Sequence, residues 1–311
     1  MNTLNNARFT ICEVRRRLET SPEEFYTHRL FEKNAITSET VSILMTSSNR
    51  SKQVSYTLQT IARSAYKNVH VILVDDSTTD PVTPAMLEPL PFSVDFITIN
   101  RATKCWHNPV VNYNIGFKYI KGGYVILQNA EVCHVGDVIS YLVGNVPESE
   151  YWVFDVRASK GHDANEEIYR LGTDTPAVYT NDALYMLWYQ HQTNDRKFHF
   201  LAGGKRSTFD RIGGFSFDYM LGSCWDDDDY LLKIQAQKIP IRSIYHPVSG
   251  CGGIHLYHVI AGESWDRNVE CNDTILKRKR DYLARHGIYI EVSDHPTEFV
   301  EYYRKLVENR A

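Results

Sequence analysis

The chain has 311 residues, a formal net charge of −4 and 43% hydrophobic residues. This length fits one large domain or two small ones, and the slightly acidic balance argues against a nucleic-acid-binding protein. No stretch reaches the roughly 18 consecutive apolar residues of a membrane span, and the first residues lack the apolar core of a signal peptide. We therefore expect a cytoplasmic protein without a transmembrane segment. Its six cysteines show no CxxC spacing, and we expect them to be reduced thiols.

Strands and helices are predicted to alternate along most of the chain. Residues 1–40 are polar and helix-prone, and Ser21-Pro22 is a typical helix start, so we expect a helical N-terminal extension. Apolar runs predict strands at 41–46, 68–74, 94–99 and 123–127. Helical spacing predicts helices at 51–66, 109–120, 135–143 and 272–286. This alternation predicts an α/β fold with a mostly parallel sheet.

Polar residues follow three of the predicted strands, in the segments 46–50, 75–80 and 129–131. Ligands of parallel sheets bind at the carboxyl ends of the strands, where hydroxyls and carboxylates can hydrogen-bond a base and a ribose. For Asp75-Asp76-Ser77, a helix cap or an Asx turn is the alternative. The glycine-rich patterns GxGxxG and GxxxxGK[ST] are both absent. A bound nucleotide would therefore need a metal ion or basic side chains at its diphosphate.

Four consecutive aspartates, Asp226 to Asp229, lie between Trp225 and Tyr230. Crowded carboxylates repel one another, and partial burial would raise the pKa of at least one of them, which is one way to build a general base. Helical spacing places Asp227 on the face of the apolar residues that follow it. The alternative is that these acids only stabilise the positive end of a helix.

Four segments in this order resemble the inverting glycosyltransferases of family 2: residues 42–50, 74–80, 114–131 and 213–233. The resemblance covers roughly residues 41 to 260. It implies a GT-A fold, which is a Rossmann-like mixed, mostly parallel sheet flanked by helices. It also implies a nucleotide-sugar half at 41–145 and an acceptor half at 146–260, and we expect helical extensions at 1–40 and 261–311.

The resemblance also implies how a UDP-sugar is bound. Thr46 and Asp76 would contact the uracil, Asp75 would support them, and Arg101 would contact the base or the diphosphate. The full set of nucleotide-binding candidates is Thr46, Ser48, Arg50, Asp75, Asp76, Arg101 and Asn129.

The tripeptide Asn129-Ala130-Glu131 stands where the family carries its DxD motif. Asn129 can still hydrogen-bond a ribose, and Glu131 can still bind Mn²⁺ or Mg²⁺ through oxygen. The resemblance implies that a late histidine, His258 or His255, completes the metal site. His134 is a weaker candidate, and surface or packing roles are the alternative for these histidines.

In the aspartate run the resemblance implies that Asp227 is the catalytic base. Asp226, Trp225 and the pair Gly203-Gly204 would line the donor sugar and the acceptor. Alternatively, Trp225 belongs to the core and the glycines form a plain turn. The basic run 277–280 is expected to be a solvated helix face, with a phosphate or an anionic membrane surface as the less favoured partner.

The implied function is transfer of a sugar from UDP to a hydroxyl of a glycan, lipid or protein, by a single displacement that inverts the anomeric centre. A catalytically decayed nucleotide-sugar-binding protein is one alternative, since Asn129 replaces a carboxylate. A sugar-nucleotide nucleotidyltransferase is another, but it would need a GxGxRL-type loop that this chain lacks. The donor sugar, the acceptor and the oligomeric state stay open.

Overall fold

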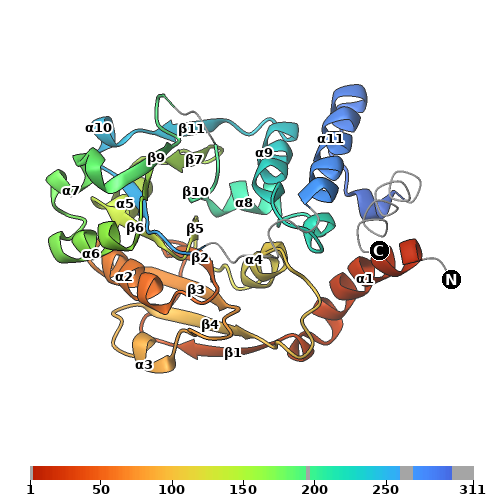
Figure 1. The fold of residues 1–311 in the computed structure, drawn as a ribbon, viewed down its shortest axis with the longest axis horizontal. Coiled ribbons are helices and arrows are strands. Elements are labelled where there is room, and N and C mark those ends of the chain that lie inside the picture. Colours follow the sequence, from red (N-terminus) through yellow and green to blue (C-terminus); the bar gives the residue numbers. More distant parts are fainter. Residues whose placement is uncertain (1–2, 194–196, 260–268, 296–311) are drawn as a thin grey trace.

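The computed structural model describes residues 3–193, 197–259 and 269–295. Its centre is an eight-stranded sheet with the order β1-β4-β3-β2-β5-β10-β7-β11 (Figure 1). Strands β4, β3, β2 and β5 are parallel neighbours, β10 is antiparallel to both β5 and β7, and β11 is parallel to β7. The strands are β1 (Tyr26–Phe31), β2 (Val41–Ser47), β3 (Val69–Asp75), β4 (Ser93–Ile99), β5 (Tyr124–Asn129), β7 (Tyr151–Phe154), β10 (Leu201–Lys205) and β11 (Ile241–Ile244).

Apolar side chains cover both faces of this sheet, because alternate residues of a strand point to opposite sides. In β2, Ile43 and Met45 join one core cluster, whereas Leu44 joins the other. The first cluster includes residues of α2 (Ser51–Ala62), α3 (Pro84–Leu87) and α5 (Val138–Asn145). The second includes residues of α1 (Thr3–Thr20), α4 (Val110–Phe117), α8 (Arg206–Ile212) and α9 (Asp226–Ala236). The strands and helices expected for the segment 41–145 are therefore confirmed, with shifts of a few residues at their ends.

A second sheet of four strands, in the order β6-β12-β8-β9, was not anticipated from the sequence. It consists of β6 (Val132–Val135), β8 (Val156–Ser159), β9 (Tyr185–Tyr189) and β12 (Gly252–His255), and α6 (His162–Leu171), α7 (Pro176–Thr180) and α10 (His246–Ser249) accompany it. Strand β12 runs antiparallel to β6, with His255 opposite Val132. This pairing brings a late segment of the chain next to the end of β5.

The N-terminal extension is only partly helical, so the expectation for residues 1–40 was wrong in part. Helix α1 is followed by a single 3-10 turn, η1 (Pro22–Glu24), and then by β1, which adds to the main sheet antiparallel to β4. The side chain of Ser21 forms no capping hydrogen bond. Strand β1 instead satisfies the free backbone groups along the edge of β4.

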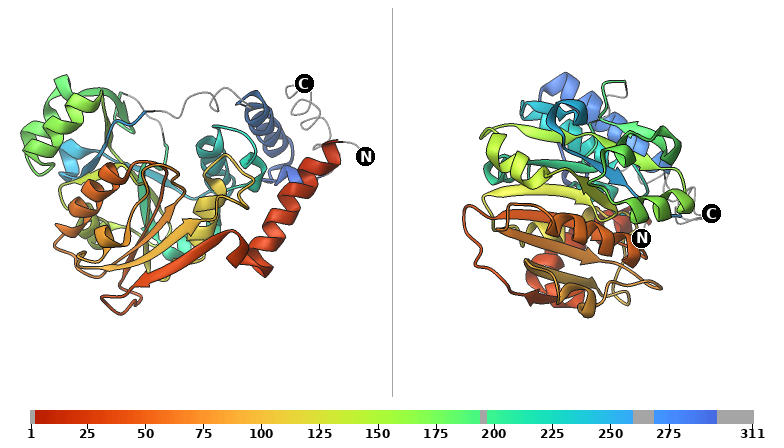
Figure 2. Two further views of the ribbon diagram at one scale, coloured as in Figure 1. Left: turned by 60° about the horizontal axis from the view of Figure 1, so that its bottom comes forward. Right: turned by 90° about the vertical axis from the view of Figure 1, so that its left-hand side faces the viewer.

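The C-terminal helix α11 (Val269–His286) and the turn η4 (Val292–Asp294) lie beside α9 and α1, at one end of the molecule (Figures 1 and 2). An ion pair of 3.1 Å between Arg15 and Asp294 joins the two extensions. Of the helical extension expected at 261–311, residues 261–268 and 296–311 lie outside the described residues. Among the helices of the described part, none is both long and apolar enough to cross a lipid bilayer. Five cysteines are free thiols there.

Candidate active site

The carboxyl ends of β3, β2 and β5 gather the residues expected to bind a nucleotide. In the strand register Thr46 lies opposite Asn129 on one side, and Ser47 lies opposite Asp75 on the other. Just beyond the strands, the Ser48 hydroxyl donates to the Asp76 carbonyl at 3.2 Å. The structure thus places residues from three separate segments at one edge of the sheet.

Asp76 is nearly buried, and cations surround its carboxylate. Arg101 donates to Oδ1 at 2.5 Å, Asn112 donates to Oδ2 at 3.2 Å, and the Lys104 ammonium also bonds Oδ2. Burial lowers the pKa of Lys104, although the Asp76 charge opposes this effect. The sequence reasoning included Arg101 but missed Lys104 and Asn112. Lys104 follows Arg101 by three residues in the same loop, which was an available signal.

Asp75 shapes the turn after β3. It accepts hydrogen bonds from the Ser77 hydroxyl at 2.7 Å and from the Val82 amide at 3.3 Å. Burial raises the pKa of Asp75 to about 6. Asp75 therefore holds the turn after β3 through its side chain, and its support of a bound nucleotide stays a prediction.

Glu131, His255 and His258 form a cluster with the composition of a metal site. Their ligand atoms all lie within 4.8 Å of one another, and each histidine Nε2 is 3.3 Å from Oε1 of Glu131. The short loop after β5 carries Glu131, while the β6–β12 pairing brings up His255, so the second sheet creates this cluster. The Leu256 amide donates to the Glu131 carbonyl at 3.0 Å and fixes the two segments together.

The Glu131 carboxylate has one oxygen engaged and one free of partners. The Arg50 guanidinium donates to Oε1 at 2.6 Å, whereas Oε2 is buried without a hydrogen-bond partner. Burial alone would raise the pKa of Glu131, but the Arg50 cation and the hydrogen bonds from His255 and His258 outweigh it and hold that pKa well below its usual range. Glu131 is thus an ionised carboxylate with an unpartnered oxygen.

His134 lies apart from this cluster. It is buried, its Nε2 contacts Gln128 Oε1 at 2.8 Å, and its amide donates to Thr60. Burial lowers its pKa to about 4. The weaker metal candidate is therefore a packing residue.

Helix α9 begins with the aspartate run, and its four carboxylates have different surroundings. Asp227 is 32% exposed, and its Oδ1 lies 2.9 Å from Nε2 of His199. Asp226 is half-buried and accepts a hydrogen bond from the Asn108 amide at 3.0 Å. Burial, together with the Asp227 charge, raises the pKa of Asp226 to about 7. Such an unequal carboxylate pair is typical of acid–base sites.

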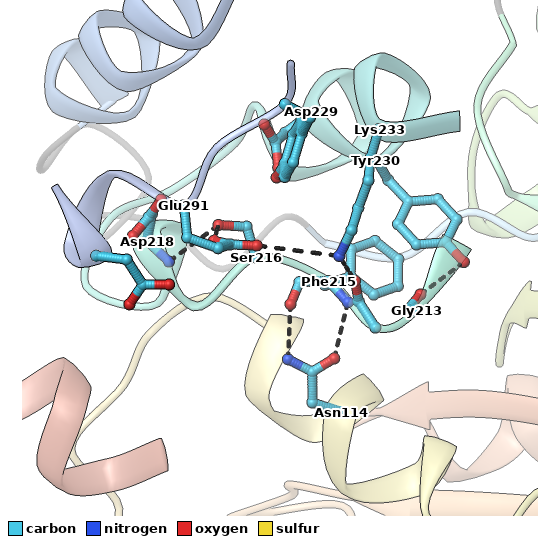
Figure 3. Close-up of polar contacts among 12 residues, drawn as sticks. Asn114, Gly213, Phe215, Ser216, Asp218, Asp229, Tyr230, Lys233 and Glu291 are labelled. Atoms are coloured by element: carbon cyan, nitrogen blue, oxygen red, sulfur yellow. Dashed lines mark hydrogen bonds and ion pairs between the residues drawn. The ribbon is translucent and has the colours of Figure 1, made fainter. Parts of the chain in front are cut away.

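The other two aspartates face the C-terminal helix. Asp228 lies 3.4 Å from Arg280, and the buried Asp229 accepts a hydrogen bond from Tyr289 at 2.6 Å. Lys279 lies 2.9 Å from Asp218 and 3.5 Å from Asp229. Figure 3 shows Asp229 and Lys233 on α9, with Asp218 and Glu291 on neighbouring segments.

Lys279 corrects the expectation that the run 277–280 is a solvated helix face. Its side chain is 0% exposed. Burial alone would lower its pKa, but the carboxylates of Asp218, Asp229 and Glu291 outweigh that effect and raise it. One cation of the run therefore binds the C-terminal helix to the aspartate helix.

The chain enters α9 through two residues with left-handed backbone. Cys224 has φ of 64° and Trp225 has φ of 69°, which costs about 1–2 kcal/mol for each residue that is not glycine. The buried Asn272 of α11 donates to the carbonyls of Ser223 and Cys224 at 3.1 and 3.0 Å. Trp225 itself is half-buried against the core. The hydrogen bonds from Asn272 stabilise the strained loop that leads into the first turn of α9.

Gly203 and Gly204 lie within β10, opposite Ile126 and Val125 of β5. A Cβ on Gly203 would lie 3.0 Å from the Leu142 side chain, and one on Gly204 would lie 2.9 Å from the Glu150 carbonyl. The close approach that these glycines permit is therefore to the protein itself. The expectation that they line the donor sugar and the acceptor stays a prediction.

Tyr113 of α4 joins the two halves of the site, and the sequence reasoning missed it. Its buried hydroxyl donates to Oδ1 of Asn129 and to the Gln128 carbonyl, each at 3.3 Å. Burial raises its pKa, and the charges of Glu131, Asp227 and Asp226 add to this effect. The metal and base candidates therefore act electrostatically on the side chain that contacts Asn129.

Residues 42–217 match the family described as glycosyl transferase family 2. Because the match covers more than half of the chain, the protein belongs to this family. No curated protein is similar enough in sequence to count as a match.

Several solved structures are similar to this one, and those with TM-scores above 0.5 share its fold. TarS 1–349 of S. aureus in complex with UDP-GlcNAc aligns with a TM-score of 0.53 and 11% identity over 87% of this chain and 72% of that chain. GalNAc-T7 with UDP, GalNAc and Mn²⁺ aligns with a TM-score of 0.51 and 12% identity over 86% of this chain and 55% of that chain. The mannosyltransferase PcManGT from Pyrobaculum calidifontis, in complex with GDP-Man and Mn²⁺, aligns with a TM-score of 0.48 and 13% identity over 99% of this chain and 83% of that chain. The expected α/β GT-A fold is confirmed.

Proposed function

We propose that this protein is an inverting glycosyltransferase that moves a sugar from UDP to a hydroxyl of a glycan, lipid or protein. The observation that carries the proposal is the arrangement around Tyr113. Its hydroxyl donates to Asn129 at the end of β5, and Asn129 lies opposite Thr46 of β2. The charges of Glu131 and Asp227 also act on it. A transfer from a nucleotide-sugar requires nucleotide, diphosphate and acceptor groups in such proximity.

The hydrogen-bonding capacity of Asp76 favours a uracil base. Lys104 and Asn112 both reach Oδ2, while Arg101 alone, among the described residues, reaches the side-chain Oδ1. A carboxylate oxygen accepts about two hydrogen bonds, so Oδ1 keeps one acceptor position. Uracil offers a single ring N–H, whereas guanine offers adjacent donors that need two acceptors side by side.

The residues present fit a divalent cation. Glu131 supplies an ionised carboxylate with an unpartnered buried oxygen, and His255 and His258 supply two imidazoles. Mg²⁺ prefers oxygen ligands in octahedral geometry, so the imidazoles favour Mn²⁺ of the two expected ions. Bound there, the ion would neutralise charge that develops on the donor's β-phosphate.

The chain's own residues supply the rest of the reaction. Asp227 takes the proton of the acceptor hydroxyl while the oxygen of that hydroxyl forms a bond to the anomeric carbon. The bond from that carbon to the β-phosphate oxygen breaks, its electron pair stays with UDP, and UDP leaves from the opposite face. Arg50 lies close enough to the metal cluster to add positive charge at the diphosphate. The anomeric configuration is inverted.

A decayed nucleotide-sugar-binding protein is the second candidate, because Asn129 replaces a family carboxylate. Asp227, exposed and held by His199, supports the enzyme instead. A binding protein has no need for an exposed carboxylate beside a second one whose pKa is raised to about 7.

Asp76→Ala is expected to weaken UDP binding by about 10- to 100-fold, because a charge-assisted hydrogen bond contributes about 1.5–3 kcal/mol. Isothermal titration with UDP measures the change. Asp210→Ala, which removes an exposed carboxylate of α8, is the control and should bind UDP as the wild type does. Unchanged affinity in Asp76→Ala would remove this residue from the base pocket.

Glu131→Gln is expected to weaken Mn²⁺ binding by at least about tenfold, because the only carboxylate of the cluster loses its charge. Electron paramagnetic resonance of free Mn²⁺ measures this without any turnover. His134→Gln, which changes a buried histidine outside the cluster, serves as the control. Wild-type Mn²⁺ affinity in Glu131→Gln would place the ion elsewhere.

A further inference from the structure

His199 occupies an aromatic box beside the aspartate helix. The residue immediately precedes Phe200 and β10, and its side chain is only 5% exposed. Its ring centroid lies 6.0 Å from Tyr113, 4.9 Å from Phe215 and 5.6 Å from Tyr230. The rings of Phe215 and Tyr230 stack with centroids 4.4 Å apart. Both side chains are drawn in Figure 3. These contacts fix the plane of the imidazole.

Within the part of the chain that the structure describes, the imidazole of His199 makes a close polar contact with Asp227. The distance of 2.9 Å between Nε2 and Oδ1 is that of a close ion pair, and it is short enough for the ring N–H to reach the carboxylate. His199 approaches from the protein interior, while Asp227 is 32% exposed. Oδ1 of Asp227 is therefore engaged on the buried side of the carboxylate, and Oδ2 is available on the exposed side.

A fixed partner matters for Asp227 because its neighbour is another carboxylate. Asp226 precedes it, and mutual repulsion disfavours conformers that bring the two groups together. A side chain in the first turn of a helix also has several rotamers open to it. A base must lie within hydrogen-bond reach of the proton it takes, and displacement of the order of 1 Å lowers the rate sharply.

We propose that His199 is a positioning residue for the catalytic base: its Nε2–H donates to Oδ1 of Asp227 and orients the carboxylate so that Oδ2 faces the acceptor hydroxyl. In the transfer step Oδ2 receives the hydroxyl proton, and His199 keeps its own proton throughout. This inference rests on the proposed function, since it assigns a role within that reaction.

The test compares His199→Phe, which keeps an aromatic ring without the donor, with His199→Gln, whose amide nitrogen reaches a position similar to Nε2. His199→Phe is expected to lower kcat by about 10- to 100-fold, with the KM for the donor and the Kd for UDP within about threefold. His199→Gln should recover most of kcat. Both variants should unfold at denaturant midpoints close to the wild type.

The outcomes separate positioning from packing. A kcat of His199→Phe within about twofold of the wild type would overturn the proposal. So would equal losses in Phe and Gln variants, because the donor would then make no difference. A kcat loss that only follows a lower unfolding midpoint would likewise assign His199 to packing.

A second measurement needs no turnover. In protein labelled with ¹⁵N-histidine, the hydrogen-bonded Nε2–H of His199 should give a slowly exchanging low-field proton signal. The signal should be lost in His199→Phe and should shift in Asp227→Asn. If the wild type releases no UDP from any donor, the proposed function fails. The presence or absence of this signal still decides whether the bond between His199 and Asp227 exists.

Discussion

Asp227→Asn is expected to lower kcat by about 10²- to 10⁴-fold while the affinity for UDP stays within about threefold. Asparagine keeps the size of the side chain and can still accept from His199, but it cannot take the acceptor proton. The base acts only during the transfer step, so binding of the nucleotide, which is held at Asp76, should be nearly unaffected. Steady-state kinetics together with UDP titration measure the two effects separately.

Asp228→Asn is the matched control, since it changes the next residue of the same helix. Asp228 lies 3.4 Å from Arg280 of α11, whereas His199 contacts Asp227. Its kcat should stay close to the wild type. If Asp227→Asn loses UDP binding, or if the two variants lose kcat equally, Asp227 is not the base.

Lys279→Met is expected to lower the free energy of unfolding by about 3–5 kcal/mol, because it leaves buried carboxylates without their shared cation. Lys279 lies 2.9 Å from Asp218 and 3.5 Å from both Asp229 and Glu291. Repulsion among these groups should separate α11 from α9 and disturb the loop that leads into the aspartate run. Urea unfolding at neutral pH measures the loss of stability.

Lys277→Met provides the comparison on the same helix. Lys277 is 70% exposed and pairs only with Asp273, one turn away, among the described residues. An exposed pair of this kind contributes about 0.3–0.5 kcal/mol, so the variant should be nearly as stable as the wild type. Similar stability of Lys279→Met and Lys277→Met would show that the buried cluster does not hold the C-terminal helix in place.

The parallel part of the fold could be predicted because its strands are continuous apolar runs, as expected for strands covered on both faces. Strand β1 could not, since only its two ends, Tyr26 and Phe31, are buried and its middle reads as polar. The burial of Lys279 was also hidden, because charge runs are usually solvated and its partners come from distant segments.

At the site, residues at strand ends were predictable, whereas those defined by long-range pairing were not. Thr46, Asp76 and Glu131 follow apolar strands and could be selected on that basis. His199 and Tyr113 lie on segments that gave no chemical signal, and only tertiary packing brings them to Asp227 and Asn129. The role of the β10 glycines could not be decided from the sequence, because glycine serves both close packing within a sheet and close approach to a ligand.

The most direct test of the account is to incubate the wild-type protein with a panel of UDP-sugars and Mn²⁺, and to follow both UDP release and the anomeric configuration of the first sugar product by proton NMR. We predict UDP release from at least one α-linked donor, stimulation by Mn²⁺, and a β-configured product. Retention of the α configuration would contradict the assignment of Asp227 as the base of a single displacement. Binding of UDP without release from any donor would support the decayed protein instead.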